Sequence, residues 1–390
     1  MKKVLFHSLT IPPDQVSTGK LVADIASKFK ENDISVEILA STPQYRFDSE
    51  KFSDEGLTKI SRNIYRSSFN GVKITHLSSS KRSFSRTKRF AQWIIYHLKS
   101  INYLIKNRNK FDTIFIFSYP PTMNLIAIFT KKILRKNTIY SVWELYPEIA
   151  NKLNELNFNF LHKIFKSIDN YCLKNIDYVV ANSDQLKKYL IEHRKIQKNK
   201  IRVIYHFANE PEIAKCKNIT KHIMYAGNLG TPQNIESFIN TFSNSIKKYK
   251  LTIFGSGSQY QKISDLSSPL IKVNSYVPRE KLATLTSEIP FALVSLSSEI
   301  TVEGFPGKTF DYLKMNKILI GYSNPESSLA KFIEKYQLGI NIDPDDINID
   351  IKLSMLEDEN FIKQIYFNIS EMNNHFANID LAVKQYMELI

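Results

Sequence analysis

The sequence predicts an α/β protein with two Rossmann-like, doubly wound domains and a cleft between them. Its 390 residues are too many for one compact core and suit two domains of about 150–200 residues each. Short apolar runs alternate with helical patterns along the chain, which is typical of βαβ units around a parallel sheet. With 43% hydrophobic and 23% charged residues, the chain can fill both cores.

The first series of units predicts an N-terminal domain over residues 1–207. A strand over residues 4–7 precedes a helical pattern over residues 18–30 and a second strand over residues 36–39. Further short apolar runs are the strand candidates 72–76, 113–117, 138–142, 178–181 and 203–205. Together they favour one doubly wound sheet.

The second series predicts another Rossmann-like domain over residues 222–358. Its strand candidates are residues 223–226, 251–254, 271–273, 291–296 and 318–321. Helical patterns lie between them, at residues 234–248, 260–266, 308–315 and 328–336. The polar stretch 208–221 contains Pro211, so we expect the linker there, and residues 359–390 have a helical pattern.

The N-terminal residues favour a buried strand over a signal peptide, because Pro12, Pro13 and Asp14 interrupt the apolar run. No window approaches the roughly 18 consecutive apolar residues of a transmembrane helix. The only cysteines are Cys172 and Cys216, which suits a reducing compartment and buried structural thiols. We therefore expect a cytoplasmic protein.

The net charge of +15 favours an acidic partner, namely membrane lipid, nucleic acid or a phosphorylated substrate. A genome that enriches lysine is the alternative explanation. Residues 81–110 contain nine Lys or Arg and no Asp or Glu, interleaved with aromatic and aliphatic residues. This pattern predicts a basic amphipathic helix on an anionic membrane surface, or else a solvated face over a buried stripe. No recognised nucleic-acid module accompanies the charge, so we expect no nucleic-acid partner.

Two glycine turns in the second domain follow predicted strands. The first has the sequence YAGNLG, in which Gly227 and Gly230 flank Asn228. The second contains Gly255 in the sequence FGSG. Glycines at the carboxyl ends of parallel strands let the backbone approach a ligand closely, although ordinary strand-to-helix turns remain the alternative.

The segment EITVEGFPGKTFD, residues 299–311, joins several chemical groups between a strand and a helix. Pro306 and Gly307 are expected to open the helix, and Lys308 adds a charge in its first turn. Free backbone N–H groups and this charge predict a cradle for a diphosphate. Glu303 can accept hydrogen bonds from sugar hydroxyls and Asp311 from a ribose diol; solvated charges are the alternative.

Together with residues 276–282, YVPREKL, these motifs resemble the donor-binding half of retaining GT-B glycosyltransferases of family 4. The resemblance implies that Glu303 and Asp311 are the paired acidic residues of that family, with aspartate at a position where glutamate is usual. Where many members carry Arg and Lys after the first glycine turn, this chain has Thr231 and Gln233, which shifts phosphate binding toward Lys308. The implied donor-binding residues are Gly19, Gly227, Asn228, Gly230, Gln233, Gly255, Val277, Pro278, Phe305, Pro306, Gly307, Thr309 and Asp311.

In the first domain, polar and aromatic residues follow two predicted strands. Ser118 and Tyr119 come after the strand 113–117, and Glu144 and Tyr146 come after the strand 138–142. Carboxyl ends of parallel strands are where such sheets bind ligands. The run WELYPE resembles a motif of the surface-polysaccharide branch of the family, so Glu144 is the expected acceptor-side carboxylate, unless it is only a surface charge. By the same resemblance, the turn containing Gly19 is expected to face the donor phosphates, unless Gly19 is only a helix-entry residue.

The resemblance implies retaining transfer from a UDP-sugar, including N-acetylated amino sugars, to a glycan or polyprenyl-diphosphate-linked acceptor in surface polysaccharide (O-antigen or capsule) biosynthesis. Glu303, Lys308 and Glu144 are the expected catalytic residues, and the C-terminal helices are expected to cross back to the first domain. We expect no cofactor and no metal, because no DxD-like pair stands out as a site for a metal-bound diphosphate, and His76 and His206 lack metal-ligand spacing. The alternatives are a nucleotide-sugar 2-epimerase of the same fold, or a non-catalytic basic protein that binds membranes or nucleic acid.

Overall fold

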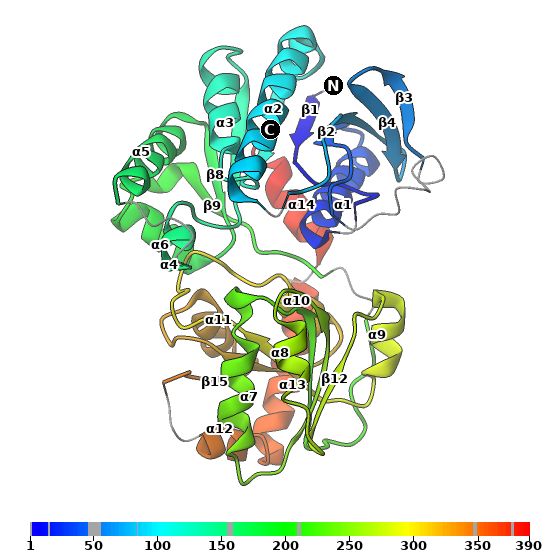
Figure 1. Ribbon diagram of the computed structural model, residues 1–390, viewed down its shortest axis with the longest axis vertical. Helices are drawn as coiled ribbons and strands as arrows, with labels where there is room; N and C mark the ends of the chain where they lie inside the picture. The colour runs from blue at the N-terminus through cyan, green and yellow to red at the C-terminus, as the bar shows by residue number, and fades with distance from the viewer. Residues whose placement is uncertain are drawn as a thin grey trace. The chain divides into compact units, whose positions relative to one another are not determined.

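The computed structural model describes residues 2–14, 16–45, 56–83, 85–153, 159–208, 212–345, 349–375 and 378–390. The chain divides into two compact units, each with its own sheet (Figure 1). Unit 1 comprises Met1–Pro147, Phe158–Tyr205 and Asp380–Ile390. Unit 2 comprises Glu148–Asn157 and His206–Ile379.

The sheet of unit 1 has the strand order β3-β4-β5-β2-β1-β6-β7-β8-β9. Its parallel part contains β1 (Lys3–His7), β2 (Ser35–Ser41), β5 (Val72–Leu77), β6 (Thr113–Phe117), β7 (Asn137–Val142), β8 (Tyr178–Ala181) and β9 (Ile201–Val203). Two strands, β3 (Thr58–Ser61) and β4 (Ile64–Phe69), extend one edge in antiparallel pairing. The order reverses between β1 and β6, which places a ligand-binding edge at their carboxyl ends.

Helices cover this sheet through apolar stripes. The helices of unit 1 are α1 (Ser17–Glu31), α2 (Arg86–Lys106), α3 (Met123–Lys132), α5 (Asn159–Asn175), α6 (Asp184–Glu192) and α14 (Ile379–Met387), with short 3-10 turns at Arg108–Lys110 and Lys198–Lys200. The rings of Phe6 and Phe29 lie 5.2 Å apart and join α1 to the sheet. Tyr386 of α14 packs 5.8 Å from Phe115. Such buried aromatic contacts fix the helices on the sheet.

The sheet of unit 2 is entirely parallel, in the order β12-β11-β10-β13-β14-β15. Its strands are β10 (His222–Asn228), β11 (Lys250–Ser256), β12 (Ile271–Asn274), β13 (Phe291–Ser295), β14 (Ile318–Tyr322) and β15 (Gly339–Ile342). Its helices are α4 (Glu148–Lys152), α7 (Ile235–Ser243), α8 (Tyr260–Ser264), α9 (Arg279–Leu285), α10 (Lys308–Lys314), α11 (Ser328–Tyr336), α12 (Ile349–Met355) and α13 (Glu359–His375), with a 3-10 turn at Thr231–Gln233. The order reverses between β10 and β13, so the carboxyl ends of these strands mark the expected ligand crevice.

Every strand expected from the sequence has a counterpart in the structure, although β9 lies two residues before the predicted run at 203–205. Three strands were missed. β3 is fully exposed and β4 carries no continuous buried face, so neither shows the apolar run that identifies an interior strand. β15 is only four residues long and alternates between buried and half-buried positions.

The division into units differs from the expected domains of residues 1–207 and 222–358 at three places. The segment Glu148–Asn157 belongs to unit 2, although it directly follows a strand of unit 1. The boundary lies between Tyr205 and His206; of the expected linker 208–221, residues 209–211 lie outside the described residues. Within the C-terminal segment 359–390, α13 belongs to unit 2, whereas Asp380–Ile390 belongs to unit 1. Apolar side chains explain the last division, because Tyr386 and Leu389 are buried in unit 1.

Candidate functional site

The first glycine turn ends β10 in unit 2 and makes room for a lysine. Gly227 has φ +152°, a conformation that residues with side chains rarely adopt. A Cβ atom at this position would lie 2.5 Å from Nζ of Lys308. Gly255 of β11 lies beside Gly227 in the sheet register. Glycine at position 227 therefore lets the lysine amine approach the backbone.

Two buried tyrosines hold this turn in place. The hydroxyl of Tyr225 donates to the carbonyl of Asn228 at 2.7 Å. The hydroxyl of Tyr312 accepts from the N–H of Ala226 at 2.8 Å and donates to its carbonyl at 3.0 Å. Because Tyr312 lies on α10, these bonds connect the end of β10 to the helix that begins with Lys308.

The side chain of Gln233 closes the loop after β10. Its Oε1 accepts from the N–H of Gly230 at 3.2 Å and from Nδ2 of Asn228 at 3.3 Å. The carbonyl of Gln233 accepts from Oγ of Ser295, at the end of β13. Gln233 thus shapes the loop, whereas a basic residue would supply a free charge.

Lys308 is the most unusual group of this site. Its side chain is half-buried, but its terminal amine is buried and makes no hydrogen bond within the described residues. The amine lies 3.9 Å from the centre of the Tyr225 ring. Burial lowers the pKa of Lys308 to about 7, although the negative charge of Asp311 acts in the opposite direction. A buried donor without a partner is costly, which points to a ligand-binding role.

Most groups around Lys308 are engaged in hydrogen bonds or packing within the protein itself. The N–H of Thr309 donates to the carbonyl of Pro306 and the N–H of Phe310 to that of Gly307, both at 3.1 Å. These amides are therefore less available for a phosphate than the sequence suggests. Phe305 is buried and packs 5.1 Å from Phe332. Thr309 is fully buried, and its hydroxyl has no hydrogen-bond partner within the described residues.

Glu303 is 2% exposed and both of its carboxylate oxygens have protein partners. Oε1 forms an ion pair with Nζ of Lys152 at 2.9 Å. Oε2 accepts from the N–H of Thr301 at 2.9 Å and from its hydroxyl at 3.3 Å. Lys152 also donates to Oγ1 of Thr301 at 3.0 Å, so the three residues form one polar cluster.

Sequence reasoning missed Lys152, which belongs to α4 and lies far from Glu303 along the chain. An apolar side chain of the same helix also comes close to this loop, because a Cβ atom at Gly304 would lie 3.8 Å from Cδ1 of Ile149. A buried carboxylate requires a positive partner or several donors, and this requirement was the one signal that a cation had to come from elsewhere.

The remaining donor-side candidates lie at the same edge of the sheet. Asp311 is half-buried in the first turn of α10 and interacts electrostatically with Lys308. Val277 and Pro278 lie in the loop between β12 and α9; Val277 is half-buried and Pro278 is exposed. Their loop follows the carboxyl end of β12, and Gly227 and Gly255 lie at the carboxyl ends of β10 and β11.

In unit 1, Ser118 joins the ends of β6 and β7. Its Oγ accepts from the N–H of Trp143 at 3.0 Å and from that of Glu144 at 3.5 Å. Glu144 is exposed at the end of β7, and Tyr146 is half-buried. The carbonyl of Tyr146 accepts from Nη2 of Arg194 at 3.0 Å. These residues share one sheet edge, as the sequence predicts.

A second cluster at this edge contains Tyr119 and Tyr45, together with Arg82 of the basic run and Asp14 of the loop after β1. The hydroxyls of Tyr119 and Tyr45 are hydrogen-bonded to each other. Arg82 lies with its guanidinium carbon 5.2 Å from the centre of the Tyr45 ring. Asp14 is buried and accepts from the N–H of Gln44 at 2.8 Å. Arg82 is therefore part of this cluster and less available to a membrane surface than the basic run 81–110 suggests.

Gly19 lies in the first turns of α1, where it is buried against the preceding loop. A Cβ atom here would lie 2.8 Å from the carbonyl oxygen of Thr10. The glycine is thus required for close packing of α1 on the loop after β1. This observation explains the residue without a ligand.

The two histidines at strand ends are buried and structural in their contacts. Burial lowers the pKa of both His76 and His206 to about 4, so both are neutral at pH 7. His76 contacts Oγ of Ser67 at 2.7 Å and the carbonyl of Ser41 at 2.9 Å. Over the described ranges, no group of three or more His, Cys, Asp or Glu side chains is arranged to hold a metal ion.

Comparison with known proteins finds a family match over about the first half of the chain. Residues 18–210 match the model of Glycosyltransferase Family 4. No curated protein sequence matches the chain. The family match supports glycosyl transfer as the class of activity.

Solved structures resemble the chain over its whole length. Sucrose-phosphate synthase from Thermosynechococcus elongatus has a TM-score of 0.75 at 13% identity, covering 100% of this chain and 98% of that one. HepE from Anabaena in complex with UDP-glucose has a TM-score of 0.67 at 13% identity, covering 100% and 99%. The lipopolysaccharide outer core galactosyltransferase WaaB has a TM-score of 0.65 at 14% identity, covering 100% and 99%. These similarities confirm the predicted fold class, the GT-B fold with two Rossmann-like domains.

Proposed function

We propose that this chain transfers a sugar from a UDP-sugar and that unit 2 binds the nucleotide. The observation that carries the proposal is the buried amine of Lys308, which has no hydrogen-bond partner within the described residues and lies beside the glycine turn after β10. The fold that the chain shares with HepE, whose structure holds UDP-glucose, supports the choice of donor.

A diphosphate fits the chemistry of Lys308. Its N–H donors are unused within the described residues, and its charge is only partly retained at neutral pH because the pKa is about 7. An anionic ligand would favour the protonated form and supply the missing acceptors. A hydrogen bond between charged partners contributes about 1.5–3 kcal/mol, enough to dominate recognition of the phosphates.

Other residues at this sheet edge fit the remaining parts of the donor. We assign Asp311 to the ribose hydroxyls, and Val277 and Pro278 to the border of the base. Glu303 has both oxygens bonded to Thr301 or Lys152, but a carboxylate has about four acceptor positions. We therefore assign its remaining positions to hydroxyls of the donor sugar, with Lys152 and Thr301 fixing its orientation.

Retention at the anomeric carbon is part of the proposal. The bond between that carbon and the diphosphate oxygen breaks, and the acceptor oxygen forms the new bond on the same face. The acceptor proton passes to an oxygen of the leaving diphosphate, so no side-chain nucleophile is needed. Lys308 stabilises the negative charge that develops on the leaving group, which is how preorganised cations accelerate such transfers.

We assign the acceptor to unit 1, at the edge formed by the ends of β6 and β7. Glu144 is exposed there and is positioned to bind or orient an acceptor hydroxyl, with Ser118, Tyr119 and Tyr146 around it. The acceptor class that we propose is a glycan or a polyprenyl-diphosphate-linked glycan of a bacterial surface polysaccharide, and the transferred group includes N-acetylated amino sugars.

We further propose that unit 1 binds the inner face of the cytoplasmic membrane through helix α2. Phe90, Ile94, Leu98 and Ile105 follow one another at helical spacing and are 41–63% exposed. Helix α2 contains no acidic residue, and its cations include Lys88 and Lys106. An exposed apolar stripe with positive charges beside it matches an anionic bilayer. In the part of the chain that the structure describes, no helix is long and apolar enough to cross a membrane.

Calorimetry with UDP, ADP and GDP tests the donor assignment. We expect UDP to bind most tightly, and incubation with UDP-sugars and lipid-linked glycans to give a glycosylated acceptor and free UDP. A UDP-sugar that changes configuration at C2 without an acceptor would identify an epimerase instead. If no nucleotide binds, the assignment of unit 2 is wrong.

A further inference from the structure

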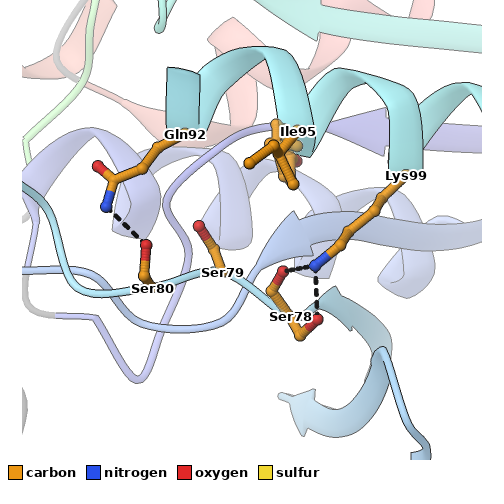
Figure 2. A pocket seen from close by; sticks show the side chains of 7 residues that line it. Ser78, Ser79, Ser80, Gln92, Ile95 and Lys99 are labelled. Carbon is orange, nitrogen blue, oxygen red and sulfur yellow. Dashed lines mark hydrogen bonds between the residues drawn. The ribbon is translucent and has the colours of Figure 1, made fainter. Parts of the chain in front are cut away.

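A cavity of about 290 Å³ lies in unit 1, between the segment that follows β5 and helix α2 (Figure 2). Three consecutive serines, Ser78–Ser80, form one wall. Gln92, Ile95, Tyr96 and Lys99 of α2 form the other. The lining thus contains one cation and no carboxylate, and none of its residues has a role in the donor site.

Two serine hydroxyls in this cavity each accept a hydrogen bond, but neither donates its own proton to another group in the described part of the chain. Oγ of Ser79 accepts from Nε2 of Gln44 at 2.9 Å. Oγ of Ser80 accepts from Nε2 of Gln92 at 2.6 Å, the contact drawn in Figure 2. Neither hydroxyl donates to any group within the described ranges, and the side chain of Ser79 points toward α2 (Figure 2). Both O–H groups are therefore available to an acceptor in the cavity.

The positive charge of the cavity is fixed in place. Nζ of Lys99 donates to the carbonyl of Ser78 at 2.6 Å and to its hydroxyl at 2.8 Å (Figure 2). An ammonium group has three N–H donors, so one remains for a ligand. Burial lowers the pKa of Lys99, which reflects the partial loss of water around it.

The side-chain amide of Gln92 does not accept hydrogen bonds from the serine hydroxyls or from Lys99, because its oxygen already has another partner and its nitrogen is a donor. Its Nε2 donates to the carbonyl of Lys81 at 2.8 Å in addition to Ser80, and its Oε1 accepts from the N–H of Ser83 at 3.2 Å. The cavity therefore offers two hydroxyl protons and an ammonium proton together. This donor set fits the oxygens of a phosphate.

The other side of the cavity is apolar. Ile95 lines it and is 53% exposed. Leu98 lies one helical turn further along α2, and Ile94 is adjacent to Ile95; both are exposed. A ligand held here would meet hydrogen-bond donors at one end and hydrocarbon at the other.

We propose that this cavity binds the phosphate of a lipid whose hydrocarbon chain lies along the exposed stripe of α2. The inference deepens the proposed function and rests on it only for the lipid-linked acceptor. Two sources share the chemistry: the diphosphate of a polyprenyl-linked acceptor and the head group of an anionic phospholipid. The experiment separates the two.

Vesicle flotation of the full chain provides the test. The three vesicle types contain phosphatidylcholine alone, with polyprenyl phosphate, or with phosphatidylglycerol at matched surface charge. We expect Ser80→Asp to weaken binding to the phosphate lipid by about tenfold or more, because a negative charge replaces a donor. The carboxylate can still accept from Gln92, so this variant retains that structural bond. Ser80→Thr keeps the hydroxyl and should bind like the wild type.

The pattern across the vesicles identifies the source of the phosphate. A preference for polyprenyl phosphate that Ser80→Asp removes assigns the cavity to the acceptor, whereas equal binding to both anionic vesicles, reduced in both by Ser80→Asp, assigns it to phospholipid. Equal binding of Ser80→Asp and the wild type to every vesicle would overturn the proposal. Lys106→Gln removes a positive charge from the same helix outside the cavity. It measures how much vesicle binding falls from the loss of one charge alone. UDP calorimetry is independent of these variants, so failure of the donor assignment is recognised separately.

Discussion

The amine of Lys308, at the start of α10, lies 3.9 Å from the centre of the Tyr225 ring of β10. The aromatic face stabilises a cation but leaves its N–H donors unsatisfied. The burial that lowers the pKa of Lys308 to about 7 also destabilises the ligand-free protein, because the amine loses water without gaining a hydrogen-bond partner in the described part of the chain. This cost is expected where a site is prepared for an anion rather than for stability.

Replacement of Lys308 by methionine is expected to weaken UDP binding at least about tenfold, because it removes a charge-assisted contact with the diphosphate worth about 1.5–3 kcal/mol. Isothermal titration calorimetry measures the change. Lys314→Met serves as a control, since Lys314 lies in the last turn of the same helix and pairs with Glu212 at 2.7 Å. Equal affinity of the wild type and Lys308→Met would remove Lys308 from the donor site.

The Lys308→Met protein is also expected to be at least as stable as the wild type at neutral pH. The pKa of Lys308 falls from 10.5 to about 7 on folding, so the unfolded chain binds more protons between these values. Stability therefore rises with pH through that window in the wild type but not in the variant. Urea unfolding at several pH values should show the advantage of the variant shrinking as pH rises. A loss of stability that is independent of pH would contradict this account.

UDP binding is expected to be coupled to proton uptake. The diphosphate pairs with the ammonium form of Lys308, which is depleted above its pKa of about 7. Apparent affinity should therefore fall by up to about tenfold per pH unit above this value, until the pKa of the complex is reached. Calorimetry in buffers of different ionisation enthalpy measures the protons taken up. In Lys308→Met the uptake should be absent, which assigns the proton to this residue.

The sequence predicts the sheets of both units well because interior parallel strands have short, continuously apolar sequences. It also points to Lys308 and to the glycine turn at Gly227, because Gly227 lies at the end of β10 and Lys308 lies where β13 leads into α10. What it misses depends on contacts between distant segments. Lys152 pairs with Glu303, which lies far from it along the chain, and no local pattern encodes that contact.

Local sequence patterns also do not predict whether a single glycine or a helix amide faces a ligand or contacts the protein itself. Gly19 fits a phosphate-binding turn by sequence, but the structure shows it packed against the carbonyl of Thr10. The amides of Thr309 and Phe310 were expected to be free at the start of a helix, yet they close tight turns with Pro306 and Gly307. In both cases the spacing in the sequence is the same whether the group faces a ligand or the protein.

Loss of Lys152 is expected to destabilise unit 2 through Glu303. Lys152→Met leaves the buried carboxylate with Thr301 as its remaining partner, and a buried charged acceptor that loses its partner costs about 1–3 kcal/mol. The partial exposure of the lysine places the cost toward the lower end of that range. Adding Glu303→Gln removes the uncompensated charge and should restore part of the stability. Urea unfolding midpoints of both single variants and the double variant measure the coupling; additive effects would show that the pair contributes nothing.

Sugar transfer is expected to continue in excess EDTA. Lys308 supplies positive charge for the leaving diphosphate, and the described residues contain no cluster of side chains suited to a metal. Initial rates of UDP release with an acceptor should be the same, within error, with EDTA and with added magnesium or manganese. Activity that disappears in EDTA and returns with either ion would show that a divalent cation neutralises the diphosphate instead.

The exposed stripe of α2 is expected to hold unit 1 on anionic membranes. Phe90→Ser combined with Leu98→Ser removes two of its apolar side chains, which are 41% and 63% exposed. Full burial of such a side chain contributes about 1.5–3 kcal/mol, so loss of both should reduce vesicle binding by about tenfold or more even where insertion is partial. Leu285→Ser, an exposed apolar position in unit 2, is the matched control. Transfer to a short soluble acceptor should be unchanged in the double variant. Vesicle binding that survives these substitutions but disappears at high salt would mean that the lysines alone make the contact, as in a purely electrostatic association.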